Sequence, residues 1–290
     1  MSLLETAIHY LGCPDDNEKL FIDGKFLVCQ VCKRKFRILN ENTIELLPKN
    51  PYKPKLAKSS KQYSEWYPKL LEGDQYSGER PNSKKVLNVD SYDLEMISKI
   101  KISQDDIICE VGSGIRSLSL QYAKKAKIVF HTDLDLEDIN VARKEAKNKK
   151  LENIFFILCN YFNLPFKKKS LPYVICTGIL GRHGKEHDEK LLKEITIKLE
   201  GKGKFVTTIN SKMKKIFFVN AAHQHYGIKK TEIVDLFSKF NCKIVSIEGL
   251  AFLPNSRNAS KYGYKILNPI SKLFFPPSMW LVKITKFELK

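Results

Sequence analysis

The chain has 290 residues, 43% of them hydrophobic and 11% aromatic, which is enough for one sizeable core and a smaller module. It contains no run of 18 apolar residues, and its first residues, MSLLETAIHYLGC, lack the basic start and small-residue cleavage site of a signal peptide. The formal charge is +18, but 43 of the 50 basic residues are Lys and only 7 are Arg, the residue favoured for phosphate and base recognition. These features argue against a membrane-spanning protein, do not by themselves indicate nucleic-acid binding, and predict a soluble, cytoplasmic protein.

Residues 1–48 are predicted to form a small β-rich module. The stretch KLFIDGKFLVC has two apolar runs around Asp23-Gly24, a dipeptide typical of a tight hairpin turn. The segment CQVCKRKFRI and a last apolar strand that ends at ELLP complete the module. Residues 49–85 begin with the Pro- and Lys-rich KNPYKPKLAKSSKQ, so they are predicted to be a linker with a short helical cover.

Three of the seven cysteines lie close together in this module, at Cys13, Cys29 and Cys32. With Asp16 they form two knuckles of x₂ spacing separated by 12 residues, which is typical of a structural Zn²⁺ site, and a carboxylate oxygen can ligate Zn²⁺. The alternative fourth ligands are Asp15 and His9. A hairpin that folds without metal is the other interpretation. The remaining four cysteines lie in apolar, strand-like stretches, where Cys packs as a small hydrophobe, so we expect a reducing compartment and no disulfides.

From residue 86 to residue 290 the pattern alternates between strand and helix. The expected strands are IICEV, KIVFHTD, IFFILCN, PYVICTGIL, GKFVTTIN, CKIVSIEGL and MWLVKITKF. The expected helices are DLEMISKI, SLSLQYAKKA, DINVARKEAKNKK, KLLKEITIKL and TEIVDLFSKF. This alternation predicts an α/β domain with a doubly wound, mostly parallel, seven-stranded Rossmann-like sheet whose last two strands form an antiparallel edge pair.

The stretch ICEVGSGIRSL, residues 107–117, places Gly112 and Gly114 between an apolar strand and a helix. Such glycines let a ligand approach the backbone closely. Asp133 ends the next strand, 21 residues beyond Gly112, where a carboxylate can accept bonds from ribose hydroxyls. Glu110 would repel a pyrophosphate but could meet an ammonium group. A ribonucleoside with a cationic amino-acid end, S-adenosylmethionine, satisfies both conditions.

Residues 107 to about 210 resemble a class I S-adenosylmethionine-dependent methyltransferase. ICEVGSG resembles the first family motif, TDLDLEDINVARKEA the second, and ILCNYFNLPFKKKSLPYVICTGIL the third with its following strand. The resemblance implies that Glu110, Gly112 and Gly114 lie at the methionine and ribose side and that Asp133 binds the ribose hydroxyls. It further implies an adenine site made by three residues: Leu134, Asn160 and Tyr161.

Three positions depart from the family pattern. Arg116 stands where a third glycine is usual, Asn160 where an Asp takes the adenine amino group, and Pro172 where Asp is common. An Asn carbonyl can still accept from the adenine amine. Each site residue also has a simpler interpretation: the glycines can form a plain strand-to-helix turn, and Asp133 can be a helix N-cap. For the whole chain, the alternative is a non-catalytic methyltransferase-like scaffold.

Candidate catalytic residues are expected in loops after the strands, at the edge where doubly wound sheets bind ligands. TGILGRHG supplies Arg182 and His183, and AAHQHYG supplies His223, His225 and Tyr226. Histidine accepts a proton near neutral pH, so His183, His225 and Tyr226 are the predicted catalytic residues. The alternatives are ordinary loop residues or, for HQH, a metal site.

The module pattern LGCP…FLVCQVCKRKFRILNENTIELLP resembles a small zinc-ribbon family that activates methyltransferases and also occurs fused in front of them. That resemblance implies a protein partner for the ribbon. For the methyl acceptor, the apolar NPISKLFFPPSMWLV favours a small-molecule or lipid-linked compound, either by lining a pocket or by touching a membrane surface; ordinary packing of the edge hairpin is the alternative. Lysines interleaved with aromatic residues, as in YSEWYPK and KYGYK, keep RNA as the second acceptor class.

Overall fold

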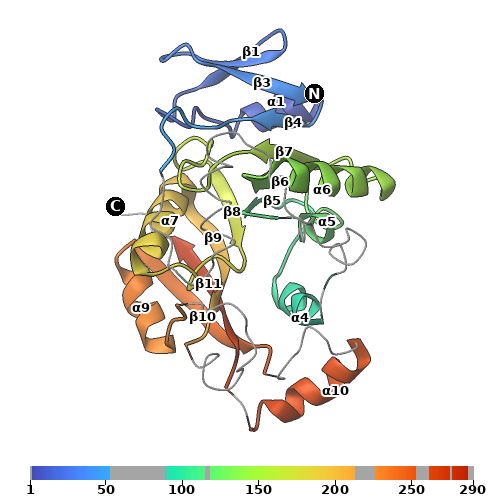
Figure 1. The fold of residues 1–290 in the computed structure, drawn as a ribbon, viewed down its shortest axis with the longest axis vertical. Coiled ribbons are helices and arrows are strands. Elements are labelled where there is room, and N and C mark those ends of the chain that lie inside the picture. Colours follow the sequence, from blue (N-terminus) through green and yellow to red (C-terminus); the bar gives the residue numbers. More distant parts are fainter. Residues whose placement is uncertain are drawn as a thin grey trace.

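The computed structural model describes residues 2–52, 89, 91–114, 118–212, 226–252, 261–274 and 276–286 (Figure 1). The strands are β1 Leu20–Asp23, β2 Phe26–Cys29, β3 Lys35–Asn40, β4 Thr43–Glu45, β5 Ile107–Val111, β6 Ile128–Asp133, β7 Ile154–Leu158, β8 Leu171–Cys176, β9 Leu199–Asn210, β10 Cys242–Leu250 and β11 Met279–Lys286. The helices are α1 Leu3–Ile8, α4 Ser91–Lys99, α5 Ser119–Tyr122, α6 Leu136–Asn148, α7 Lys185–Lys198, α9 Lys230–Ser238 and α10 Lys261–Ser271.

One large mixed sheet organises the described residues. Its strand order is β1-β2-β3-β4-β7-β6-β5-β8-β9-β11-β10. Strands β7, β6, β5, β8 and β9 run parallel, whereas β11 pairs antiparallel with both β9 and β10. The doubly wound, mostly parallel sheet with an antiparallel edge pair was therefore predicted correctly. The sheet is longer than the expected seven strands, because four N-terminal strands continue it in the same ladder.

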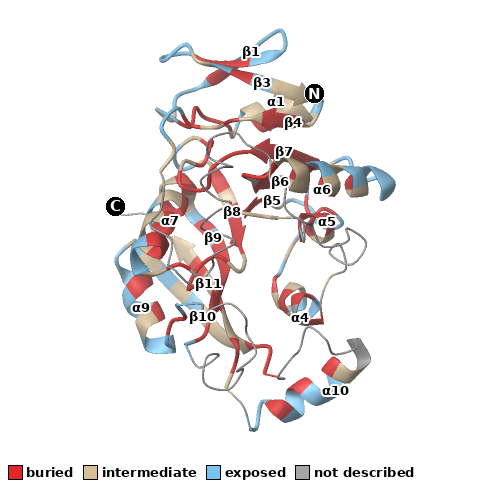
Figure 2. Cartoon of the chain, viewed as in Figure 1, coloured by how far each residue is buried: buried red, intermediate tan, exposed pale blue. Residues whose placement is uncertain are grey.

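The strands of the sheet bury side chains on both faces. In β5, Cys109 and Val111 pack into one core cluster and Ile108 into the other, as the two-residue period of a strand requires. The first face is covered by α7, α9 and the N-terminal module, and the second by α4, α5 and α6. Figure 2 shows the resulting band of buried residues along the central strands. No helix in the described ranges is long and apolar enough to cross a membrane.

The N-terminal module joins the α/β domain through the edge of the sheet. Its hairpin forms as predicted, with Asp23 paired to Phe26 across the turn and Gly24 at φ +58°. Strand β4 then pairs parallel with β7, and Leu46 N donates to Leu158 O at 2.9 Å. Strand β4 thus pairs with the edge of β7 that would otherwise be open. Side chains of the module and of the domain also belong to one hydrophobic core.

A buried lysine also connects the two parts. Lys198, at the end of α7, is 1% exposed, and its Nζ donates to Phe166 O at 2.9 Å and to the Asn17 side chain in the loop after Cys13. Glu194 Oε1 lies 3.4 Å from the same Nζ. Burial lowers the pKa of Lys198, whereas Glu194 opposes that shift. The ammonium thus depends on partners from both parts of the chain.

Replacing Lys198 with Met should lower the free energy of unfolding by about 3 kcal/mol, because the Glu194 carboxylate loses its buried partner. Urea denaturation of the full chain measures this loss. The double variant Lys198→Met/Glu194→Gln should recover part of it. Lys239→Met removes an ion pair with Glu189 on the exposed surface and should cost less than about 1 kcal/mol. Equal losses for the two lysines would contradict the connecting role of Lys198.

Candidate functional site

A pocket opens at the carboxyl edge of the parallel strands. Because these strands share one direction, the loops that follow β5, β6, β7 and β8 meet at this edge. The residues that line the pocket are Gly112, Gly114, Thr132, Asp133, Leu134, Asp138, Cys159, Tyr161, Thr177, Gly178, Ile179, Arg182 and His183. The structure therefore brings together most of the predicted cofactor residues and one predicted catalytic residue, His183.

The two glycines of the loop after β5 have different reasons to be glycine. Both have positive φ, +63° at Gly112 and +60° at Gly114. A Cβ on Gly112 would lie 2.4 Å from Cδ1 of Ile179, so the end of that side chain would have to shift to admit it. A Cβ on Gly114 would meet nothing within 4 Å. The space beside Gly114 is thus open to a ligand that approaches the backbone.

Asp133 joins the glycine loop to the end of β6. Its Oδ2 accepts from Gly114 N at 2.6 Å and its Oδ1 from Asp135 N at 3.0 Å. Burial raises the pKa of Asp133 to about 6. A carboxylate has about four acceptor positions, so these bonds leave capacity for another donor such as a hydroxyl group. The N-cap of α6 is Asp135, which accepts from Glu137 N at 2.9 Å, so the alternative N-cap role for Asp133 is wrong.

The loop after β7 contributes residues on either side of Asn160. Cys159 and Tyr161 line the pocket, but Asn160 is fully buried and does not. Its Oδ1 accepts from Phe162 N at 2.9 Å, which stabilises the turn. An amide oxygen has a second acceptor position, so this bond does not prevent a contact with an adenine amine, but the Asn160 side chain does not line the pocket.

Glu110 lies behind the glycine loop and is absent from the pocket lining. Its carboxylate accepts from Ser119 N at 2.8 Å and from the Ser119 hydroxyl, at the start of α5. Burial raises the pKa of Glu110 to about 7, against the opposing effect of the Ser119 hydrogen bonds. In this structure Glu110 holds the start of α5 in place and does not line the pocket, and its predicted place at the methionine side of a cofactor stays a prediction.

His187 and Asp188, which the sequence analysis did not single out, lie next to residues that line the pocket. Tyr161 Oη lies 3.1 Å from His187 Nε2, and His187 Nδ1 lies 3.5 Å from Asp188 Oδ1. Asp188 Oδ2 accepts from Gly181 N at 2.9 Å, and burial raises the pKa of Asp188. The rings of His183 and His187 are 4.7 Å apart. His183 lies in the turn before α7, which begins at Lys185, so helical spacing does not account for this contact and no local sequence pattern indicated it.

The other predicted catalytic residues are only partly described. Tyr226 is exposed and does not line the pocket, but its N donates to Arg182 O at 3.4 Å, so it lies beside the loop of His183. His223, His225 and Arg116 lie outside the described residues. Their predicted roles stay predictions.

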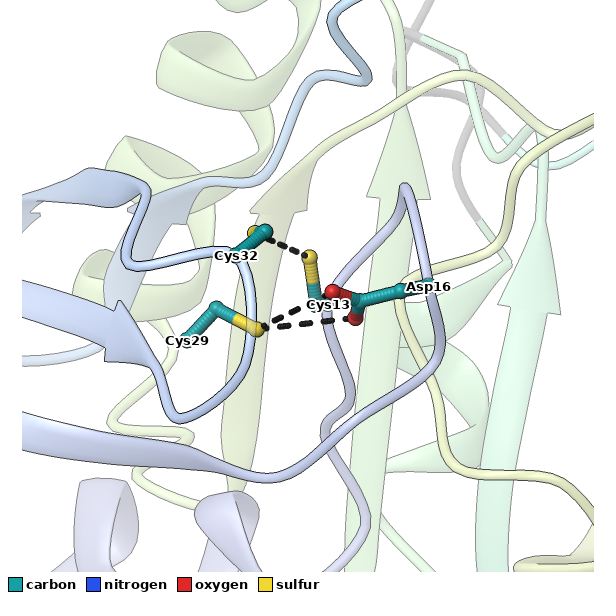
Figure 3. A group of neighbouring side chains, drawn as sticks. All are labelled: Cys13, Asp16, Cys29 and Cys32. Atoms are coloured by element: carbon teal, nitrogen blue, oxygen red, sulfur yellow. Dashed lines mark hydrogen bonds between the residues drawn. The ribbon is translucent and has the colours of Figure 1, made fainter.

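A second candidate site lies in the N-terminal module (Figure 3). The four predicted metal ligands converge, and all their ligand atoms lie within 4.8 Å of one another: Cys13, Asp16, Cys29 and Cys32. Cys13 Sγ and Cys32 Sγ are 3.7 Å apart, and Cys29 Sγ is 3.3 Å from Asp16 Oδ2. Zn–S bonds of about 2.3 Å in a tetrahedron separate two sulfurs by about 3.8 Å. The donor set and its spacing therefore fit a tetrahedral Zn²⁺ ion. The alternative ligand Asp15 is instead paired with Arg34.

The part of the chain that holds the pocket is similar to known proteins. Residues 108–203 match the family model described as a methyltransferase domain. A ubiquinone/menaquinone biosynthesis C-methyltransferase UbiE from Rickettsia prowazekii is 35% identical over 115 residues, 37% of this chain and 46% of the relative. A "Probable ribosomal RNA small subunit methyltransferase A" from Methanosphaera stadtmanae is 29% identical over 89 residues, 29% of this chain and 33% of the relative.

A solved structure shows the same fold over a larger share of the chain. The geranyl diphosphate C-methyltransferase of Streptomyces coelicolor, in complex with Mg²⁺, geranyl-S-thiolodiphosphate and S-adenosyl-L-homocysteine, matches with a TM-score of 0.51 and 13% identity. The match covers 73% of this chain and 82% of that one. This chain spans less than half the length of the curated relatives above. Residues 108–203 are therefore similar to methyltransferase domains.

Glu110 should make the stability of the fold depend on pH. Its pKa is about 7 in the folded chain against a usual 4.5, so its contribution is full below pH 4.5 and is lost as the pH rises through 7. Between pH 5 and pH 8 the wild type should lose about 2 kcal/mol that Glu110→Gln does not lose. Urea denaturation at both pH values measures the difference. Glu41→Gln, on an exposed turn, should follow the wild type; a Glu110→Gln variant that also does so would contradict the assignment.

Proposed function

We propose that this protein is an S-adenosylmethionine-dependent methyltransferase that acts on a small-molecule or lipid-linked acceptor. One observation carries the proposal: the open backbone at Gly114 and the carboxylate of Asp133 share one pocket wall, inside the segment that matches the methyltransferase-domain model. Donors and acceptors at that wall suit a ribose and its attached groups.

The charge of the pocket suits this cofactor better than a dinucleotide. Asp133 and Asp138 line it together with Arg182, so carboxylates outnumber the guanidinium; such a lining disfavours a pyrophosphate but not a cationic sulfonium with an ammonium group. Gly112 and Gly114 would let the cofactor lie close to the backbone. Asp133 would accept hydrogen bonds from the ribose hydroxyls, and Leu134 would pack on the adenine. Tyr161 lines the pocket beside Gly112, with its Cδ1 3.8 Å from the place of a Gly112 Cβ.

When bound, the cofactor supplies a methyl group activated for in-line displacement. The chain has to orient the acceptor and, for a hydroxyl or acidic carbon, remove a proton. His183 lines the pocket and is the nearest described imidazole to it, so we assign it the proton-accepting role. Its neighbour His187 is hydrogen-bonded to Tyr161, which fixes the wall between the two loops.

Two observations support the acceptor class. One relative is named a quinone-biosynthesis C-methyltransferase, and the matching solved structure is a C-methyltransferase with a geranyl compound bound. The chain also has the apolar segment NPISKLFFPPSMWLV at residues 268–282. RNA is the second candidate, since one relative is named as a ribosomal RNA methyltransferase and the chain carries a charge of +18.

Two glycine variants give a matched test of cofactor binding. Gly114→Ala and Gly24→Ala each place a Cβ in open space at φ near +60°, so each should cost roughly 1–2 kcal/mol of stability. Only Gly114→Ala should weaken binding of S-adenosylmethionine, by roughly tenfold or more in a calorimetric titration. Equal affinity for the two variants would count against the pocket. A folded wild type that binds neither cofactor nor product would support the scaffold interpretation instead.

Transfer of a radiolabelled methyl group tests the acceptor. We expect incorporation into prenylated quinol-type or prenyl diphosphate acceptors and none into ribosomal RNA transcripts. His183→Ala should lower the turnover rate by about 100-fold while cofactor affinity changes little. Incorporation into RNA alone would replace the first candidate with the second.

We also propose that Cys13, Asp16, Cys29 and Cys32 hold a structural Zn²⁺ ion. The fit of four donors within 4.8 Å supports it. The ion would clamp the loop after β2 to the loop that carries Asn17, and Asn17 contacts the buried Lys198. The metal would thereby stabilise the contact between the module and the methyltransferase domain.

Metal analysis of the purified chain should find about one Zn²⁺ per molecule. Cys29→Ser and Cys32→Ser should lose it, whereas Cys242→Ser, on β10 away from the cluster, should keep it. Asp16→Cys should retain zinc against a chelator better than the wild type, because thiolate is the preferred ligand. Zinc content that is unchanged in Cys32→Ser would refute the site.

A further inference from the structure

Helix α10 buries three uncharged polar side chains and exposes its large apolar ones. Tyr264, Asn268 and Ser271 are buried, at the spacing that places them on one face of a helix. Tyr264 Oη donates to Glu95 Oε2 at 2.6 Å, and Asn268 Oδ1 accepts from Phe252 N at 2.8 Å. These bonds to α4 and to the segment after β10 set the orientation of the helix.

The opposite side of α10 and its following turn carry a contiguous apolar stripe. Its members are Ile266, Leu267, Ile270, Leu273 and Phe274. Leu273 is 80% exposed and Phe274 71%, the largest values among the exposed hydrophobic side chains of the described residues. Figure 2 shows this helix largely in the colour of exposed residues. Large apolar side chains gathered on one exposed face are typical of an interaction surface.

The segment of sequence that contains the stripe carries charge of a single sign, and the acidic side chain that contacts α10, Glu95, is bonded to Tyr264 and Asn268 on its buried side. From residue 249 to residue 287 the sequence contains six basic residues and no acidic one. Lys265 and Lys272, each next to a member of the stripe in sequence, are exposed. Long lysine side chains can reach headgroups while neighbouring apolar groups enter the lipid. This combination suits an anionic lipid surface better than an acidic peptide, which would leave the apolar stripe uncovered.

The sheet places α10 on the pocket side of the molecule. Strand β10 runs parallel to β9, because both pair antiparallel with β11. Since β9 is parallel to β8, β10 ends, at Leu250, at the same edge of the sheet as the pocket loops. Phe252, two residues later, is hydrogen-bonded to Asn268 of α10. The stripe therefore belongs to the edge at which an apolar acceptor would enter.

We propose that α10 and its turn dock this protein on the surface of an anionic lipid bilayer. The apolar stripe enters the boundary between headgroups and acyl chains, and the lysines of the same segment contact the headgroups. With 11 residues, α10 is too short to cross a bilayer, so the contact is interfacial. The docking surface goes beyond the proposed methyl transfer and does not depend on it.

Co-sedimentation of the full chain with vesicles tests the proposal. The wild type should bind vesicles of phosphatidylcholine with phosphatidylglycerol and bind pure phosphatidylcholine weakly. Leu273→Ser/Phe274→Ser should lower the partition coefficient by roughly tenfold or more, and Lys265→Gln/Lys272→Gln by roughly tenfold. Added salt should weaken binding to the anionic vesicles.

The matched control is Val245→Ser, which removes a 60% exposed apolar side chain on β10 and should bind as the wild type does. Circular dichroism melting checks that all variants fold. Failure of the wild type to bind anionic vesicles, or equal binding by Leu273→Ser/Phe274→Ser, would overturn the proposal. It would also be overturned by a wild-type dimer that ignores vesicles and that Leu273→Ser/Phe274→Ser converts to a monomer. Cofactor titration of the same samples keeps this result separate from the methyltransferase proposal.

Discussion

Parallel hydrogen bonding between β5 and its two neighbours is the constraint on which the rest of this structure depends. Glu110 is in register with His131 on one side and with Ile175 on the other. Because the three strands end together, the glycine loop, the carboxylate of Asp133 and the Thr177–Ile179 loop face one another across a pocket. A sheet with any of these strands reversed would carry the same residues to opposite edges.

The same sheet buries charged groups, and each of them needs partners. Glu110 is bound by the first residue of α5, Asp188 by the backbone of Gly181, and Lys198 by groups from two parts of the chain. A buried charge without a partner is costly, so these contacts tie loops and helix ends to the strands. These contacts hold the loops that form the pocket walls against the helices and strands.

Our proposals assign a different ligand to each of three sites in the chain. The pocket suits a cationic nucleoside cofactor, the cysteine cluster suits a structural metal, and the apolar stripe of α10 suits a lipid surface. The sheet relates them: β4 attaches the module at the β7 edge, and β10 leads to α10 at the other.

By itself the sequence determined the strand–helix alternation, the hairpin at Asp23-Gly24, the glycine loop, Asp133 and the four clustered metal-ligand candidates, because these signals are local or have fixed spacing. Only the tertiary structure decided that β4 extends the sheet and that Glu110 faces Ser119. It alone also revealed His187 behind Tyr161 and turned the apolar side of α10 outward. These features depend on contacts between residues far apart in the chain, such as Tyr264 with Glu95, which no local pattern records.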